Sequence, residues 1–224
     1  MSKHPDLPVN VAPDDIDESN DVELLSDEGE VEDDPCRIPG GRPAIVWQLW
    51  PALRARVSRA TLRQLARRLR RAARRVGVAL EDLSSVTVSV VDDAEIQRLN
   101  AAHMGKDQPT DVLSFPGRPP SAEFAEFAAV DCPLGDIVLS WDAVLRQSAA
   151  RMPAQASGHA LASAALDEAT VLAIHGLCHL LGHDHAARGE ARTMHRREIR
   201  GLRAARVADI PRPCDPRPGL CSGR

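Results

Sequence analysis

Five stretches of the chain predict helices, and the first of them has the pattern of an amphipathic helix. The first is clearest, because Leu62, Leu65 and Leu69 recur at helical spacing between arginines. Asp92, with Glu95 three positions later, is typical of the start of the second helix. The predicted helices span residues 58–76, 93–102, 141–152, 164–181 and 190–207.

Shorter stretches predict strands. In residues 85–91 valines alternate with serine and threonine, which is typical of a half-buried strand. Residues 112–115 and 137–140 predict two more strands. Residues 45–50 are a short apolar patch that is either a strand or a docking segment. The chain therefore combines helices with strands, and its length of 224 residues allows one domain with a sizeable core.

The two ends of the chain differ from its middle. Residues 1–41 are acidic and poor in large apolar side chains, and residues 208–224 are rich in proline. Neither end buries enough to offset its chain entropy, so we expect both to be disordered. One domain is then predicted over residues 42–207.

The net charge of −4 conceals a division along the chain. Residues 1–35 hold 13 acidic residues and one lysine, whereas residues 36–224 hold 19 acidic and 27 basic residues. A basic domain favours an anionic partner such as nucleic acid, although an arginine-rich composition also follows from a GC-rich genome. The acidic segment is either a solubilising tail or a polyanion mimic that covers the basic face.

Features of secretion and of membrane insertion are missing from the sequence. The start of the chain lacks a basic and then apolar signal pattern, and the longest apolar run is too short to span a bilayer. The five cysteines form no C-x-x-C pair and indicate thiols in a reducing compartment. We therefore expect a cytoplasmic protein with no membrane partner.

A histidine-rich stretch, A-I-H-G-L-C-H-L-L-G-H-D-H, covers residues 173–185. His175 and His179 are four residues apart, so they project from one face of a helix. Gly182 allows the chain to turn back, and His185 follows. Three imidazoles with a fourth position open to water or substrate are typical of a catalytic zinc site, so we predict one Zn²⁺ per chain, other divalent ions being possible.

The spacing equals that of the metalloprotease motif H-E-x-x-H-x-x-G-x-x-H with one change. Gly176 occupies the position of the glutamate that acts as general base in those proteases. The chain therefore lacks the proton acceptor that these proteases use to activate the attacking water. A metal still polarises a phosphoryl oxygen or lowers the pKa of bound water, which favours a phosphodiester substrate.

Four further residues near this motif and upstream of it have open roles. His183 is either a general acid or base, or a packing residue, and Asp184 is a candidate to orient a ligand histidine. Cys178 points off the ligand face and predicts core packing. Lys106, the only lysine outside the acidic tail, is either a point charge for phosphate or a chance occurrence.

The arginines of the first helix are the remaining basic feature. Arg67 and Arg71 belong to this group, which is either a solvated helix face or an electrostatic platform for phosphates.

Three motifs together resemble the YbeY family of bacterial endoribonucleases. They are H-G-L-C-H-L-L-G-H-D-H, G-K-D-Q-P-T-D-V-L-S-F-P and L-G-D-I-V-L-S, and the resemblance covers about residues 60–207. It implies an α/β (α+β) fold, with a small mixed four-stranded sheet flanked by helices and the metal-binding helix in a cleft. It also implies zinc held by His175, His179 and His185.

The implied activity is that of a single-strand-specific, metal-dependent endoribonuclease. The resemblance places it in 16S rRNA 3′-end maturation and ribosome quality control, with rRNA and the small ribosomal subunit as partners. His183 and Lys106 are then candidate catalytic residues. Lys106, His103, Arg67 and Arg71 are candidate substrate-binding residues.

The chain departs from this family at three positions. Met104 stands where the family has a cleft arginine, which clamps phosphate and stabilises charge in the transition state. His103, Lys106 or the arginine-rich helix are candidates to compensate. Cys178 replaces a usual leucine, and His183 replaces a common tyrosine. Met104 keeps open a second hypothesis, a non-catalytic ribosome-assembly factor stabilised by zinc; a metalloprotease is disfavoured by Gly176.

Overall fold

A single mixed sheet forms the framework of the domain. The computed structural model describes residues 23–24, 45–79, 81–117, 132–185 and 188–207. The strands are β1 (Glu23–Leu24), β2 (Val46–Leu49), β3 (Val86–Val91), β4 (Val112–Pro116) and β5 (Gly135–Ser140), and their order in the sheet is β1-β2-β3-β5-β4. All neighbours are parallel except β4, which pairs antiparallel with β5 and forms one edge.

The sheet confirms the α/β class and the mixed pairing. The three predicted strands are present, and the patch at residues 45–50 forms a fourth, β2. The two-residue strand β1 adds a fifth strand next to β2, and it lies within the segment for which we predicted disorder. The remainder of residues 1–41 and all of residues 208–224 lie outside the described residues.

All five predicted helices are present. They are α1 (Arg59–Val76), α2 (Asp93–Met104), α3 (Trp141–Arg151), α4 (Gly158–Leu180) and α5 (Arg188–Ala204), with two short 3-10 helices at Pro51–Leu53 and Glu81–Ser85. Asp92 caps α2 as expected, because its carboxylate accepts the backbone N–H of Glu95 at 2.9 Å. Helix α4 begins six residues before its predicted start, since the Ser157 side chain caps it earlier.

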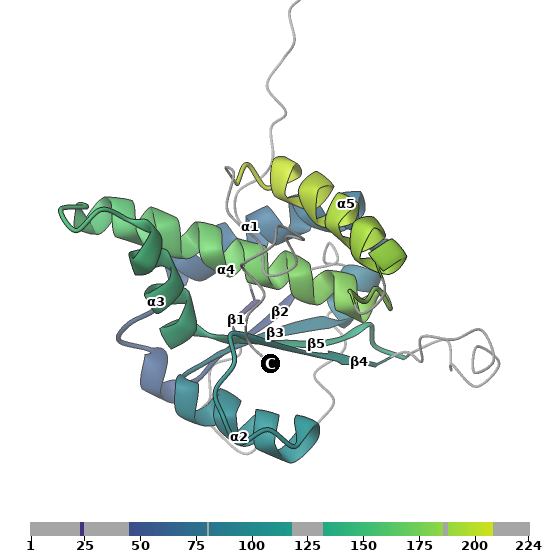
Figure 1. Cartoon of the computed structure of the whole chain (residues 1–224), viewed down its shortest axis with the longest axis horizontal. Coiled ribbons are helices and arrows are strands. Elements are labelled where there is room, and N and C mark those ends of the chain that lie inside the picture. The colour runs from purple at the N-terminus through teal and green to yellow at the C-terminus, as the bar shows by residue number, and fades with distance from the viewer. Residues whose placement is uncertain (1–22, 25–44, 80, 118–131, 186–187, 208–224) are drawn as a thin grey trace, which may run out of the picture.

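The helices form layers on both faces of the sheet (Figure 1). Helices α1, α4 and α5 lie on one face and α2 lies on the other. Helix α4 packs against β4, β5, α1 and α5, so most of its length is inside the protein. A second, smaller core lies under α2, where Ile96 packs with Val91, Leu113 and Val138.

Helix α4 is the one described helix with the length and apolar character that a membrane span requires. However, 72% of its apolar window is buried inside the domain. Leu172, Ile174 and Leu177 are fully buried in the main core. Its apolar character is therefore accounted for by packing within the domain.

Candidate metal centre

The end of α4 turns the chain so that a third histidine meets the first two. Gly182 has a φ of 77°, in the left-handed region that favours glycine. Its N–H donates to the carbonyl of His179 at 2.9 Å, and the N–H of His183 donates to the carbonyl of Cys178 at 3.0 Å. These two bonds close the helix and bring His185 back beneath its last turn.

The imidazoles of His175, His179 and His185 converge. One nitrogen of each ring lies within 4.8 Å of the others, and the Nε2 atoms of His175 and His179 are 3.1 Å apart. Nitrogens bound to one tetrahedral zinc at about 2.0–2.1 Å are separated by about 3.3 Å, so small adjustments fit these donors to such an ion. The donor set, three imidazoles and no thiolate, suits zinc and other divalent transition metals.

Glu198 of α5 sets the orientation of His175. Its Oε1 lies 2.7 Å from Nδ1 of His175, and both side chains are buried. An ionised carboxylate accepts hydrogen bonds only, so Nδ1 carries the proton. In neutral His175 the lone pair is then on Nε2, the atom that faces the other two histidines, and the ring is ready to bind a cation.

Glu198 is a site residue that our reading of the sequence missed. It lies 23 residues beyond His175 on a different helix, so no local spacing connects the two. Its second oxygen, Oε2, accepts no hydrogen bond among the described residues and lies 3.8 Å from Nδ1 of His195. The sequence offers one indication of this role, which is that Glu198 lies on the apolar side of the last predicted helix. Carboxylates are rarely buried without a partner, so an acidic residue at such a position indicates a polar partner inside the protein.

The cluster is deep at one end and open at the other. His175 is buried, His179 is half-buried and His185 is exposed. Burial lowers the pKa of His179 to about 4, and repulsion from His175 and His185 acts in the same direction. His179 is therefore neutral at physiological pH, as a metal ligand must be. The His185 side of the cluster is therefore the side that faces solvent.

Two residues next to the cluster have other contacts. The carboxylate of Asp184 accepts the backbone N–H of His185 at 2.7 Å, so it stabilises the loop. His183 lines an open hollow of about 190 Å³ together with Glu190 and Thr193 of α5. Burial and the nearby Arg197 lower the pKa of His183, so the unprotonated form of this imidazole is favoured.

Gly176 is held against the sheet. A Cβ atom at this position would lie 2.9 Å from Cγ2 of Ile137 and 3.1 Å from Oγ of Ser114. The position of the protease glutamate therefore faces β5 and β4 and has no room for a longer side chain. This packing supplies a steric reason for the missing general base. Cys178, as predicted, is buried in the core.

Gly176→Glu is expected to destabilise the domain by at least about 3 kcal/mol and to confer no peptidase activity. The new side chain overpacks the contact with the sheet and buries an unpaired carboxylate. Thermal unfolding measures the loss. Gly158→Glu is the matched control, since a Cβ atom added to this glycine at the start of the same helix would have no atom within 4 Å, and an acidic residue there suits the helix dipole. Wild-type stability together with casein hydrolysis in Gly176→Glu contradicts the prediction.

The upstream candidates lie on the other side of the edge strand. Ser114 of β4 faces Gly176, so its neighbour Phe115 faces the opposite side, where its ring is 5.1 Å from that of His103. Met104 ends α2 and is 46% exposed, and Lys106 is exposed in the following loop. The structure therefore places these residues on the α2 side of the sheet and does not bring them into the histidine cluster.

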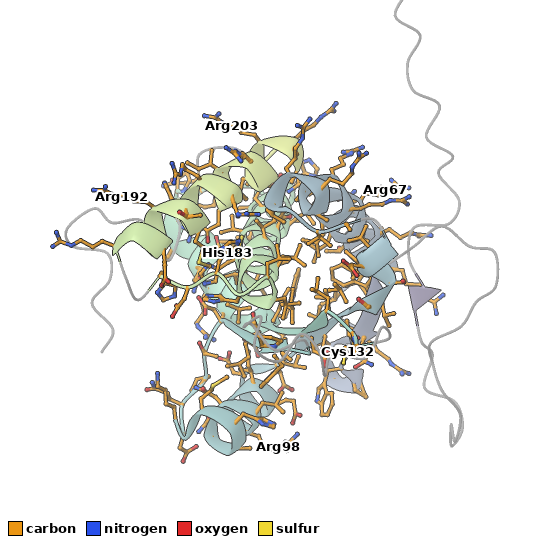
Figure 2. All side chains as sticks on the ribbon, turned by 90° about the vertical axis from the view of Figure 1, so that its right-hand side faces the viewer. Arg67, Arg98, Cys132, His183, Arg192 and Arg203 are labelled. Carbon is orange, nitrogen blue, oxygen red and sulfur yellow. The ribbon has the colours of Figure 1, made fainter. Side chains whose placement is uncertain are left out.

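The two candidate arginines of α1 lie on the same side of the sheet as the histidines. Arg71 is exposed and Arg67 is half-buried, and Arg67 points away from the core in Figure 2. Neither belongs to the three-histidine cluster. Their role in substrate binding stays a prediction.

Comparison with known proteins identifies relatives of the chain. The family model described as Endoribonuclease YbeY matches residues 53–206 of the chain. The Endoribonuclease YbeY of Bacillus licheniformis is 38% identical over 141 residues, which make up 62% of this chain and 82% of that protein. The protein of the same name from Moorella thermoacetica is 40% identical over 139 residues, or 61% and 81% of the two chains. That from Deinococcus radiodurans is 44% identical over 100 residues, or 45% and 55%.

Proposed function

The chain belongs to the YbeY family of endoribonucleases, and on that premise we propose that it is a zinc-dependent endoribonuclease that cuts single-stranded RNA. Its proposed role is 16S rRNA 3′-end maturation and ribosome quality control, in the cytoplasm and with the small ribosomal subunit as partner. The convergence of the three imidazoles, with Nδ1 of His175 held by Glu198 so that its Nε2 faces the other two rings, is the observation that carries the proposal.

The site has the parts that metal-assisted hydrolysis of a phosphodiester needs. His175, His179 and His185 would hold the ion, and the exposed position of His185 leaves one side of the cluster accessible to RNA. A bound divalent ion supplies Lewis-acid stabilisation of charge on the phosphate and lowers the pKa of water. His183, neutral beside the site, is our candidate to accept the proton of the attacking water.

We propose that the RNA strand crosses the edge strand β4. The histidines lie beyond one face of this strand, and His103 and Lys106 lie beyond the other. An extended backbone that passes over the edge reaches both groups. Lys106 is exposed there and supplies a positive charge for a phosphate.

A second function, that of a non-catalytic assembly factor, is favoured by Met104. This exposed side chain has no charge with which to stabilise a phosphate, at the position where the family resemblance implies an arginine. The two functions predict different results in one assay.

The wild-type protein is expected to cut single-stranded rRNA, to stop when EDTA removes the metal and to recover when zinc is restored. Met104→Arg is expected to cut up to about tenfold faster, because an added guanidinium beyond the edge strand binds a phosphate of the RNA that crosses it. Gel analysis of end-labelled RNA measures both rates. Ala149→Arg adds the same charge at an exposed position on α3 and serves as the control. Cutting by Met104→Arg alone favours the assembly factor, and cutting that survives EDTA contradicts the metal mechanism.

A further inference from the structure

Helices α1 and α5 together form an arginine-rich surface. The two helices pack against one another on the side of the molecule away from the sheet, and Figure 2 shows Arg67 of α1 and Arg192 and Arg203 of α5 pointing outward there. We call the surface formed by six of the exposed side chains the α1–α5 arginine face. They are Arg71, Arg74, Arg75, Arg192, Arg200 and Arg203.

The face is not balanced by acidic side chains. Helix α1 contains no aspartate or glutamate, and α5 contains only Glu190 and the buried Glu198. Within the described ranges, none of the six arginines forms an ion pair. In contrast, Arg56, Arg98, Arg146 and Arg151 elsewhere each pair with a carboxylate. A general surplus of arginine does not explain this difference, so the face has the character of a site for a polyanion.

The face is rigid. Gly201 of α5 lies so close to α1 that a Cβ atom there would be 2.8 Å from Cγ1 of Val76. In addition, Nη1 of Arg197 donates to the carbonyl of Val76 at 2.6 Å, which satisfies the end of α1. The arginine stems are therefore attached to two helices that are held at a fixed distance.

The chemistry of the face fits a double-helical backbone better than a single strand. Proteins that bind single strands without sequence preference stack bases on aromatic side chains, and neither α1 nor α5 contains phenylalanine, tyrosine or tryptophan. Double-stranded RNA is recognised by its shape and its phosphates, for which a rigid array of guanidinium groups is suited.

Helix α5 links the face to the histidine cluster. Helix α5 carries Glu198, which holds His175, and it carries Arg192, Arg200 and Arg203 on its exposed side. Its 17 residues extend for roughly 25 Å at the rise of an α-helix. We propose that the α1–α5 arginine face binds the phosphate backbone of an RNA stem that flanks the single-stranded segment to be cut. This inference rests on the proposed function, because it assigns the substrate a structured part.

The test compares two RNAs, a short single strand and the same strand joined to a hairpin stem. The face variant is Arg74→Gln/Arg200→Gln/Arg203→Gln. Arg54→Gln/Arg98→Gln/Arg146→Gln is the control, because it removes the same charge from exposed positions outside the face. Glutamine has nearly the helix propensity of arginine, so both variants are expected to fold. Dissociation constants are measured by fluorescence anisotropy with the full chain at several salt concentrations.

The face variant is expected to bind the stemmed RNA at least about tenfold more weakly than the wild type. Its salt dependence, the slope of log K against log [salt], becomes shallower by about two to three. Its affinity for the single strand, and that of the control variant for either RNA, change by less than about twofold.

Three results overturn the inference. Equal loss for both RNAs assigns these arginines to the single-strand site, and equal loss in the control variant assigns the effect to net charge. Unchanged binding of the stemmed RNA means that the face does not bind RNA and instead contacts solvent or the acidic N-terminal segment. Binding is measured in EDTA, so the RNA is not cut during the measurement. If the protein proves to have no nuclease activity, the proposed function fails, but the binding measurement still tests the role of the face.

Discussion

His179→Ala is expected to lower the cleavage of single-stranded RNA by at least about a thousandfold. Loss of a bound metal removes several kcal/mol of stabilisation from the transition state, and about 4 kcal/mol corresponds to that factor. His179 is the central member of the cluster, with its ring centroid 4.6 Å from that of His175 and 5.3 Å from that of His185. Without His179 only two imidazoles remain, which are too few to bind zinc stably.

Two measurements separate loss of metal from loss of structure. Mass spectrometry of the purified variant is expected to find less than about one tenth of the wild-type zinc, whereas circular dichroism finds the same helical content. His159→Ala is the matched control, because this histidine is exposed in the first turn of the same helix. If His179→Ala retains wild-type cleavage and zinc, the proposed metal centre is wrong.

Glu198→Gln is expected to weaken metal binding by about tenfold to a hundredfold, with a matching loss of cleavage at limiting zinc. The amide is nearly the same shape as the carboxylate, but it has no charge with which to hold the N–H of His175 and to balance a cation. Because Glu198 is only 2% exposed and Oε2 has no hydrogen-bond donor among the described residues, the metal-free protein loses little when this charge is removed.

The metal-free variant is therefore expected to melt at or above the temperature of the metal-free wild type. Zinc titration with a competing chelator measures the affinity, and thermal unfolding in EDTA measures the stability. Glu190→Gln removes an exposed carboxylate from the same helix and is the control. A fall in the melting temperature with unchanged zinc affinity contradicts the role of Glu198 in positioning His175.

The structure explains why glycine, and not the glutamate of the metalloprotease motif, occupies position 176. The motif alone indicates that the base of a metalloprotease is missing at this position. The packing of α4 on Ile137 and Ser114 adds that the helix approaches the sheet too closely for any larger side chain. The glycine at this position is thus required by the close packing of helix α4 on the sheet.

Local interactions made most of the helices and strands predictable. Asp92 caps α2 with a bond to a residue three positions away, and alternation within β3 follows from burial of one side of that strand. The three histidines belong to the same class of feature, because one helical turn and one glycine turn bring them together. These contacts span at most ten residues, so the residue pattern is sufficient to recognise them.

Contacts between distant segments were not predictable in this way. The pairing of β4 with β5, and not with β3, places Ser114 against helix α4 and His103 on the other side of the sheet. Glu198 reaches His175, and the arginines of α1 and α5 form one surface, because α5 packs across α1 and α4. Such contacts depend on how whole elements pack, which no short-range spacing encodes. The residue pattern therefore identified the three histidines that form the cluster, whereas the packing of the elements established what orients His175 and which surfaces adjoin the cluster.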